Sequence, residues 1–107
     1  LYVLPTCCDP FANSTLEALA AGLPVVTSTT NGGAELLTDA EGAVVDVARG
    51  PEPLAEALVR WSEPERLRSG AKAARALAER HGDGAKFAAT EALLEQLSER
   101  RAAGAPR

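Results

Sequence analysis

The sequence contains no methionine and begins at Leu1 on an apolar run. Because translation starts with methionine, we interpret the 107 residues as a piece of a longer protein. Apolar residues make up 46% of the sequence and charged residues 24%, a composition typical of one folded domain and unlike that of a disordered chain. No apolar run approaches the roughly 20 residues of a membrane-spanning helix, and no signal-peptide pattern is present.

Basic residues are missing from the first part of the chain, since residues 1–48 contain no lysine or arginine. A nucleic-acid-binding protein needs a basic stripe to contact phosphates, so that function is excluded. The same deficit leaves no basic patch for binding a membrane surface. Residues 51–107 carry nine acidic and ten basic side chains, a mixture typical of solvated helix faces.

Cysteine is limited to Cys7 and Cys8, which are adjacent. Adjacent cysteines rarely form a disulfide because the ring they close is strained, and no histidine lies nearby to complete a zinc site. We interpret both as small loop residues of a protein in a reducing compartment, the cytoplasm. No metal ion is expected, since no carboxylate–x–carboxylate pair is placed at the candidate site described below, and no cofactor is expected.

Short apolar runs alternate with helical segments in the first half. Residues 1–4, 24–27 and 43–47 are predicted strands, residues 14–21 a helix ended by Gly22, and residues 34–37 a helical turn. This order predicts parallel βαβ units and therefore an α/β, Rossmann-like fold. From residue 51 the pattern is helical. We predict one partial domain over 1–107, with a βαβ part at 1–50, a helical part at 51–103, and missing strands beyond the apolar edge of residues 1–4.

The segment from Asp9 to Val26 carries the candidate chemistry. It leaves the carboxyl end of a parallel strand, the edge where ligands bind in open α/β sheets. The backbone amides of Asn13, Ser14 and Thr15 open a helix, and such amides attract phosphate. The carboxylates of Asp9 and Glu17 lie on either side in the sequence and accept hydrogen bonds from sugar hydroxyls. A nucleotide-sugar contains both phosphate groups and sugar hydroxyls.

Structural roles also fit these residues. Ser14 and Glu17 have the spacing of a capping box, and Asp9 before Pro10 is an ordinary turn residue. His81 fits a helix C-terminus, and Trp61 lies on an apolar helix face and is expected to pack in the core. A non-enzymatic interaction module therefore remains an alternative at this point.

The full motif resembles a known family. Asp9, seven residues, Glu17, and then Ala18-Leu19-Ala20-Ala21-Gly22-Leu23-Pro24-Val25-Val26 is similar to the C-terminal domain of family 4 retaining glycosyltransferases (group 1), which have the GT-B fold. The resemblance continues through Asn31-Gly32-Gly33-Ala34-Glu35 and Gly42-Ala43-Val44-Val45 to Leu54-Ala55-Glu56-Ala57-Leu58. Asp9 departs from the pattern, because this position is usually glutamate; aspartate occurs in relatives of the lipopolysaccharide-core type.

The resemblance implies a role for each matching residue. Glu17 would bind the ribose, and Asp9, Ala12 and Asn13 the donor sugar. The backbone amides of Asn13, Ser14 and Thr15 would hold the diphosphate. The family's cationic Arg/Lys pair and its acceptor-binding N-terminal domain lie outside this sequence, so the resemblance implies a donor half-site that is inactive alone.

The function so implied is transfer of a hexose from a nucleotide-sugar to a hydroxyl of a cell-envelope glycan or glycolipid, as in lipopolysaccharide biosynthesis. The expected site of action is the cytoplasm, at the inner face of the cytoplasmic membrane. A sugar-nucleotide epimerase of GT-B architecture is an alternative. The expected partners are the nucleotide-sugar, the missing N-terminal domain, and a second copy of the chain through exposed apolar surface.

Overall fold

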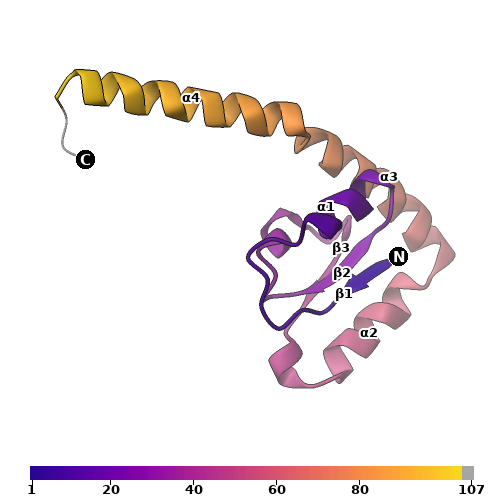
Figure 1. The fold of residues 1–107 in the computed structure, drawn as a ribbon. Helices are drawn as coiled ribbons and strands as arrows, with labels where there is room; N and C mark the ends of the chain where they lie inside the picture. Colours follow the sequence, from indigo (N-terminus) through magenta and orange to yellow (C-terminus); the bar gives the residue numbers. More distant parts are fainter. Residues whose placement is uncertain (105–107) are drawn as a thin grey trace.

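The computed structural model describes residues 1–104, and the side chains of all of these except residues 83 and 85. Three parallel strands form one sheet in the order β1 (Tyr2–Leu4), β2 (Val25–Ser28) and β3 (Gly42–Val45) (Figure 1). Tyr2 is paired with Val25, and Val25 with Gly42. The predicted α/β class and its three parallel strands are confirmed.

Helical segments connect and cover these strands. In chain order they are α1 (Asn13–Ala20), the short 3₁₀ helices η1 (Gly32–Leu36) and η2 (Val47–Arg49), α2 (Glu52–Trp61), α3 (Pro64–Arg80) and α4 (Asp83–Ala102). Gly22 has φ 76°, the left-handed conformation expected just after a helix, so the predicted stop of α1 is confirmed. The helix itself begins and ends one residue earlier than predicted.

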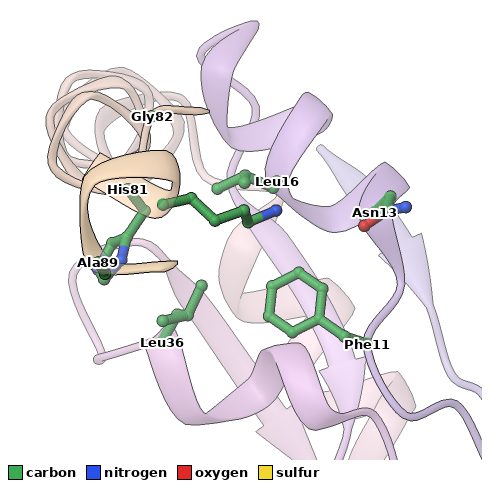
Figure 2. Close-up of a pocket in the computed structure, with 8 residues that line it drawn as sticks. Phe11, Asn13, Leu16, Leu36, His81, Gly82 and Ala89 are labelled. Atoms are coloured by element: carbon green, nitrogen blue, oxygen red, sulfur yellow. The ribbon is translucent and has the colours of Figure 1, made fainter. Parts of the chain in front are cut away.

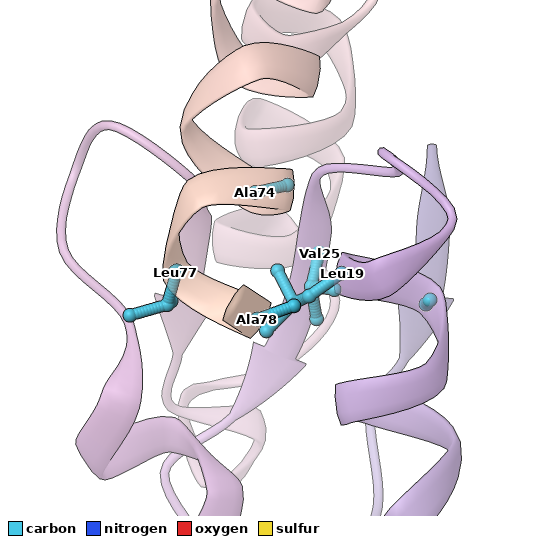
Figure 3. Packing of buried hydrophobic residues seen from close by; sticks show 6 residues of the cluster. Leu19, Val25, Ala74, Leu77 and Ala78 are labelled. Carbon is cyan, nitrogen blue, oxygen red and sulfur yellow. The ribbon is translucent and has the colours of Figure 1, made fainter. Parts of the chain in front are cut away.

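Each face of the sheet has its own apolar cluster. On one face, Leu19 of α1 and Val25 of β2 pack against Leu77 of α3 (Figure 3). On the other face, Val26 and the α2 residue Trp61 form a second cluster. Trp61 is 2% exposed, which confirms its predicted packing role. The sheet is thereby fixed between α1 and α3 on one side and α2 on the other.

The last helix, α4, extends away from the sheet (Figure 1), and the chain measures 57 × 30 × 18 Å along its principal axes. Its large apolar side chains Phe87, Leu93, Leu94 and Leu97 are all at least half exposed. None of the described helices is both long enough and apolar enough to span a lipid bilayer.

Candidate functional site

The loops that follow β1 and β2 meet at the carboxyl edge of the sheet. Asp9 and Asn31 form a parallel bridge there. The Asp9 amide donates to the Thr30 carbonyl over 3.0 Å, and the Gly32 amide donates to the Asp9 carbonyl over 2.9 Å. The loop that contains Asp9 is therefore attached to the neighbouring loop through its backbone.

The carboxylate of Asp9 shapes its own loop. One oxygen, Oδ1, accepts a hydrogen bond from the Phe11 amide over 3.1 Å. This is the local turn that aspartate forms with a backbone amide two residues further on. The turn role predicted for Asp9 is thus present, and the described residues offer no donor to the second carboxylate oxygen, Oδ2.

The helix α1 has four amides near its start without an intrahelical acceptor, as every α-helix has. Two of them are bound within the protein: the Ala12 amide donates to Asn31 Oδ1 over 3.3 Å, and the Thr15 amide donates to the Ala12 carbonyl over 2.9 Å. Among the described residues, the amides of Asn13 and Ser14 have no acceptor. The amides at this helix end that stay available to an anion are those of Asn13 and Ser14, whereas the Thr15 amide, also expected to hold a diphosphate, is already bound.

The capping-box interpretation of Ser14 and Glu17 is wrong. The residue at the N-cap is Ala12, whose side chain makes no capping hydrogen bond, and Ser14 already lies inside the helix. The Ser14 hydroxyl instead accepts a hydrogen bond from the Tyr2 hydroxyl over 2.6 Å. The Glu17 side chain is exposed and has no hydrogen-bond or ion-pair partner among the described residues.

Two grooves adjoin the first two turns of α1. The apolar groove, of about 460 Å³, lies between Phe11 and Leu36 on one side and His81 and Ala89 on the other (Figure 2). The polar groove, of about 400 Å³, is lined by Asn13 and Glu17 and also by His81 and Lys86. Lys86 lines both grooves. Two candidate residues of α1 thus face a shared hollow.

The cation at this site comes from the distant second half of the chain. The first 48 residues provide none, yet Lys86 reaches the groove that contains Asn13 and Glu17 because α3 packs against α1 and ends beside it. His81 is the C-cap residue of α3, as expected, and lines the same groove. Local sequence carries no signal for Lys86, since only tertiary packing brings it here.

The segment from β1 through α2, which contains the loop, α1 and the Asp9–Asn31 bridge, matches a described family. The model for "Glycosyl transferases group 1" matches residues 1–63. The chain belongs to the group 1 glycosyltransferases. No curated protein and no solved structure matches the chain.

Membership in the group 1 glycosyltransferases implies a role in glycosyl transfer, with a nucleotide-sugar donor and an acceptor. Asp9, the first turn of α1, Glu17 and Asn31 all lie inside the matched segment. His81 and Lys86 lie outside it and are added by the fold of this chain.

Proposed function

We propose that this chain is the donor-binding part of a retaining hexosyltransferase of family 4 with GT-B architecture. The full enzyme would transfer a sugar from a nucleotide-sugar to a hydroxyl of a cell-envelope glycan or glycolipid, in lipopolysaccharide biosynthesis. We place it in the cytoplasm, where the exposed thiols of Cys7 and Cys8 remain reduced, at the inner face of the membrane. Residues 1–107 supply the donor half, and an acceptor-binding domain completes the site.

The observation that carries this proposal is the combination of two unpaired amides with an unpaired carboxylate on one short helix. The amides of Asn13 and Ser14 suit the diphosphate, and the exposed Glu17 carboxylate, one turn further along, suits the ribose hydroxyls. Glu17 and Asn13 line the same polar groove. A carboxylate used for helix capping would not be available to a ligand, and this one is.

The donor sugar is assigned to Asp9 and Asn13, with the small, buried Ala12 keeping the loop close to the donor. The Oδ2 atom of Asp9 is available to accept a sugar hydroxyl while Oδ1 holds the turn. Glutamate at this position would place its carboxylate one methylene further from the backbone. The shorter side chain therefore favours a sugar whose hydroxyl approaches the loop closely.

The positive charge that a diphosphate requires is assigned in part to Lys86. A leaving diphosphate is stabilised by cations in the transition state, and Lys86 lines both grooves beside α1. Lys86 contributes a long-range attraction to the bound nucleotide. Turnover requires groups of the acceptor-binding domain, so we expect the chain alone to bind the donor without transferring its sugar.

The proposal is tested by titrating the isotope-labelled chain with uridine, guanosine and adenosine diphosphates and following the amide NMR signals. We expect shifts at Asn13 and Ser14. In Glu17→Gln we expect the dissociation constant to rise roughly tenfold, because hydrogen bonds to a charged acceptor contribute about 1.5 kcal/mol or more. The matched control is Glu56→Gln, an exposed glutamate on the opposite side of the sheet.

Two outcomes would contradict the proposal. One is the absence of shifts at Asn13 and Ser14 with every nucleotide, in this chain and in the full-length protein. The other is an affinity in Glu17→Gln equal to that in Glu56→Gln. Product analysis of the full-length protein without an acceptor separates transfer from epimerisation, because only an epimerase converts the donor under those conditions.

A further inference from the structure

Asn31 is a buried amide side chain at the junction of four segments. It is 1% exposed and is the N-cap residue of η1. Its Oδ1 accepts from the amides of Gly33, over 3.0 Å, and Ala12, over 3.3 Å. Its Nδ2 donates to the Thr27 hydroxyl over 3.0 Å and to the Thr15 hydroxyl over 3.2 Å. All four hydrogen-bonding positions of the carboxamide are therefore used.

The backbone around Asn31 holds the same loop from a second side. The Asp9 bridge described above pairs the loop with residues 30–32. Gly32 lies so close to the loop that a Cβ atom there would be 1.8 Å from the carbonyl oxygen of Pro10. Asp9 and Pro10 are thus in direct backbone contact with the segment that carries Asn31.

The bond from the Ala12 amide to Asn31 Oδ1 decides which amides face a ligand. Ala12 is the N-cap residue of α1, so Asn31, 19 positions away, accepts from the N-cap amide as the N3 side chain of a capping box does. Because the Ala12 and Thr15 amides are bound within the protein, the two amides left are those of Asn13 and Ser14. The same carboxamide fixes Thr15 inside α1 through its hydroxyl.

We propose that Asn31 is a positioning residue of the donor site. Its carboxamide holds the Asp9–Ala12 loop and the first turn of α1 on the sheet edge, so that the Asp9 carboxylate and the Asn13 and Ser14 amides act on one ligand. This inference rests on the proposed function, because it assigns Asn31 to the same nucleotide-sugar site. Asn31 itself is buried and does not touch the ligand.

Asparagine fits this position better than its charged isostere for a specific reason. The Thr27 hydroxyl donates its proton to the Leu4 carbonyl over 2.7 Å, so its oxygen is available only as an acceptor for Asn31 Nδ2. In Asn31→Asp, a carboxylate oxygen would face the Thr27 hydroxyl oxygen, and neither would have a proton to donate to the other. The acceptor for the Ala12 amide, in contrast, is kept.

The test separates positioning from stability by comparing two variants. Asn31→Ser removes the acceptor for Ala12, whereas Thr27→Val breaks a bond of the same carboxamide and leaves that acceptor in place. Each is titrated with uridine, guanosine and adenosine diphosphates below its own unfolding transition. We expect binding at least tenfold weaker in Asn31→Ser than in wild type, and binding within about twofold of wild type in Thr27→Val. Hydrogen exchange at the Ala12 amide should accelerate in Asn31→Ser only.

Three results are informative in different ways. Equal affinities in Asn31→Ser and Thr27→Val would overturn the positioning role and leave the proposed function standing. A wild-type chain and full-length protein that bind none of the nucleotides would overturn the proposed function itself, and this role with it. Should Asn31→Ser not fold, Asn31→Gln provides the comparison, because its longer side chain displaces the acceptor from the Ala12 amide without adding a charge: it is expected to bind at least tenfold more weakly than Thr27→Val, and equal affinities in the two would overturn the role.

Discussion

Replacement of Gly70 by alanine brings two opposing effects into one experiment. Gly70 is buried within α3, and an alanine Cβ there would lie 2.6 Å from Cζ3 of Trp61 and 2.9 Å from Cγ of Pro24. Alanine in a helix interior is favoured over glycine by about 1 kcal/mol. Overpacking of a well-packed core costs about 1–3 kcal/mol.

The structure indicates that overpacking outweighs helix propensity. Both contacts are shorter than real Cβ atoms accept, and both partners are rings that cannot turn aside; Trp61 is 2% exposed. We therefore place the cost in the upper part of its range. The expected net effect is a loss of about 1–2 kcal/mol in the free energy of unfolding and a fall in Tm of roughly 5–10 °C.

Urea denaturation measures this effect directly, because Trp61 is the only tryptophan and its fluorescence reports on the perturbed cluster, with circular dichroism as a second probe. Gly84→Ala is the matched control, since an added Cβ there has no atom within 4 Å. In Trp61→Phe, which is followed by circular dichroism because the fluorophore is gone, the smaller ring lacks Cζ3, so the cost of Gly70→Ala should shrink in that background. A Gly70→Ala protein as stable as wild type would refute this reasoning.

Three further predictions concern the donor site. Gly32→Ala should displace the loop, because its Cβ would overlap the Pro10 carbonyl, and nucleotide-induced NMR shifts should disappear while the circular dichroism spectrum keeps its helical content. Tyr2→Phe removes the donor to the Ser14 hydroxyl and should lower the free energy of unfolding in urea by about 1 kcal/mol. Lys86→Met should weaken nucleoside diphosphate binding several-fold at low salt and reduce the salt dependence of the dissociation constant.

For each of these three predictions, one result would contradict it. Unchanged NMR shifts in Gly32→Ala would mean that the loop does not form the donor site. A Tyr2→Phe protein as stable as wild type would mean that the hydrogen bond between the Tyr2 and Ser14 hydroxyls is no stronger than the bonds these groups form with water. Lys72→Met, an exposed lysine on α3 that lines neither groove, is the control for Lys86→Met, and equal behaviour of the two would remove Lys86 from the site.

Local patterns were sufficient for the strands and for the end of α1. The apolar runs of residues 1–4 and 24–27 and the glycine at position 22 act through burial, periodicity and backbone freedom, which depend on few neighbours. The capping-box prediction failed because its assumption was local. The N-cap amide of α1 is bound by Asn31, a residue beyond the next strand, and the Ser14 hydroxyl is bound to Tyr2 on the preceding strand.

In the candidate site, too, some residues are recognisable from the local sequence and others only from the tertiary packing. The assignment of Asp9, Asn13 and Glu17 to the site rests on one loop and the helix that follows it, where the resemblance to the family is readable in the sequence, and their roles stay predictions. In the sequence, Asn31 is only one residue of the match to the family and has no predicted role, since its contacts with Ala12 and Thr15 exist only once β1 and β2 are paired. Lys86 was missed for a related reason, because it reaches the groove only through the packing of α3 on α1.

The burial of Asn31 also bears on how this protein ages. An asparagine followed by glycine is the dipeptide most prone to deamidation, in which the glycine nitrogen attacks the side-chain carbonyl carbon and closes a succinimide ring. Here the Gly32 amide is engaged with the Asp9 carbonyl, and the Asn31 carboxamide is held on both ends by hydrogen bonds. Folding therefore protects the side-chain amide of Asn31 from deamidation, which proceeds in the unfolded chain. The deamidated fraction at Asn31 should accordingly increase with the time that the molecules have spent unfolded.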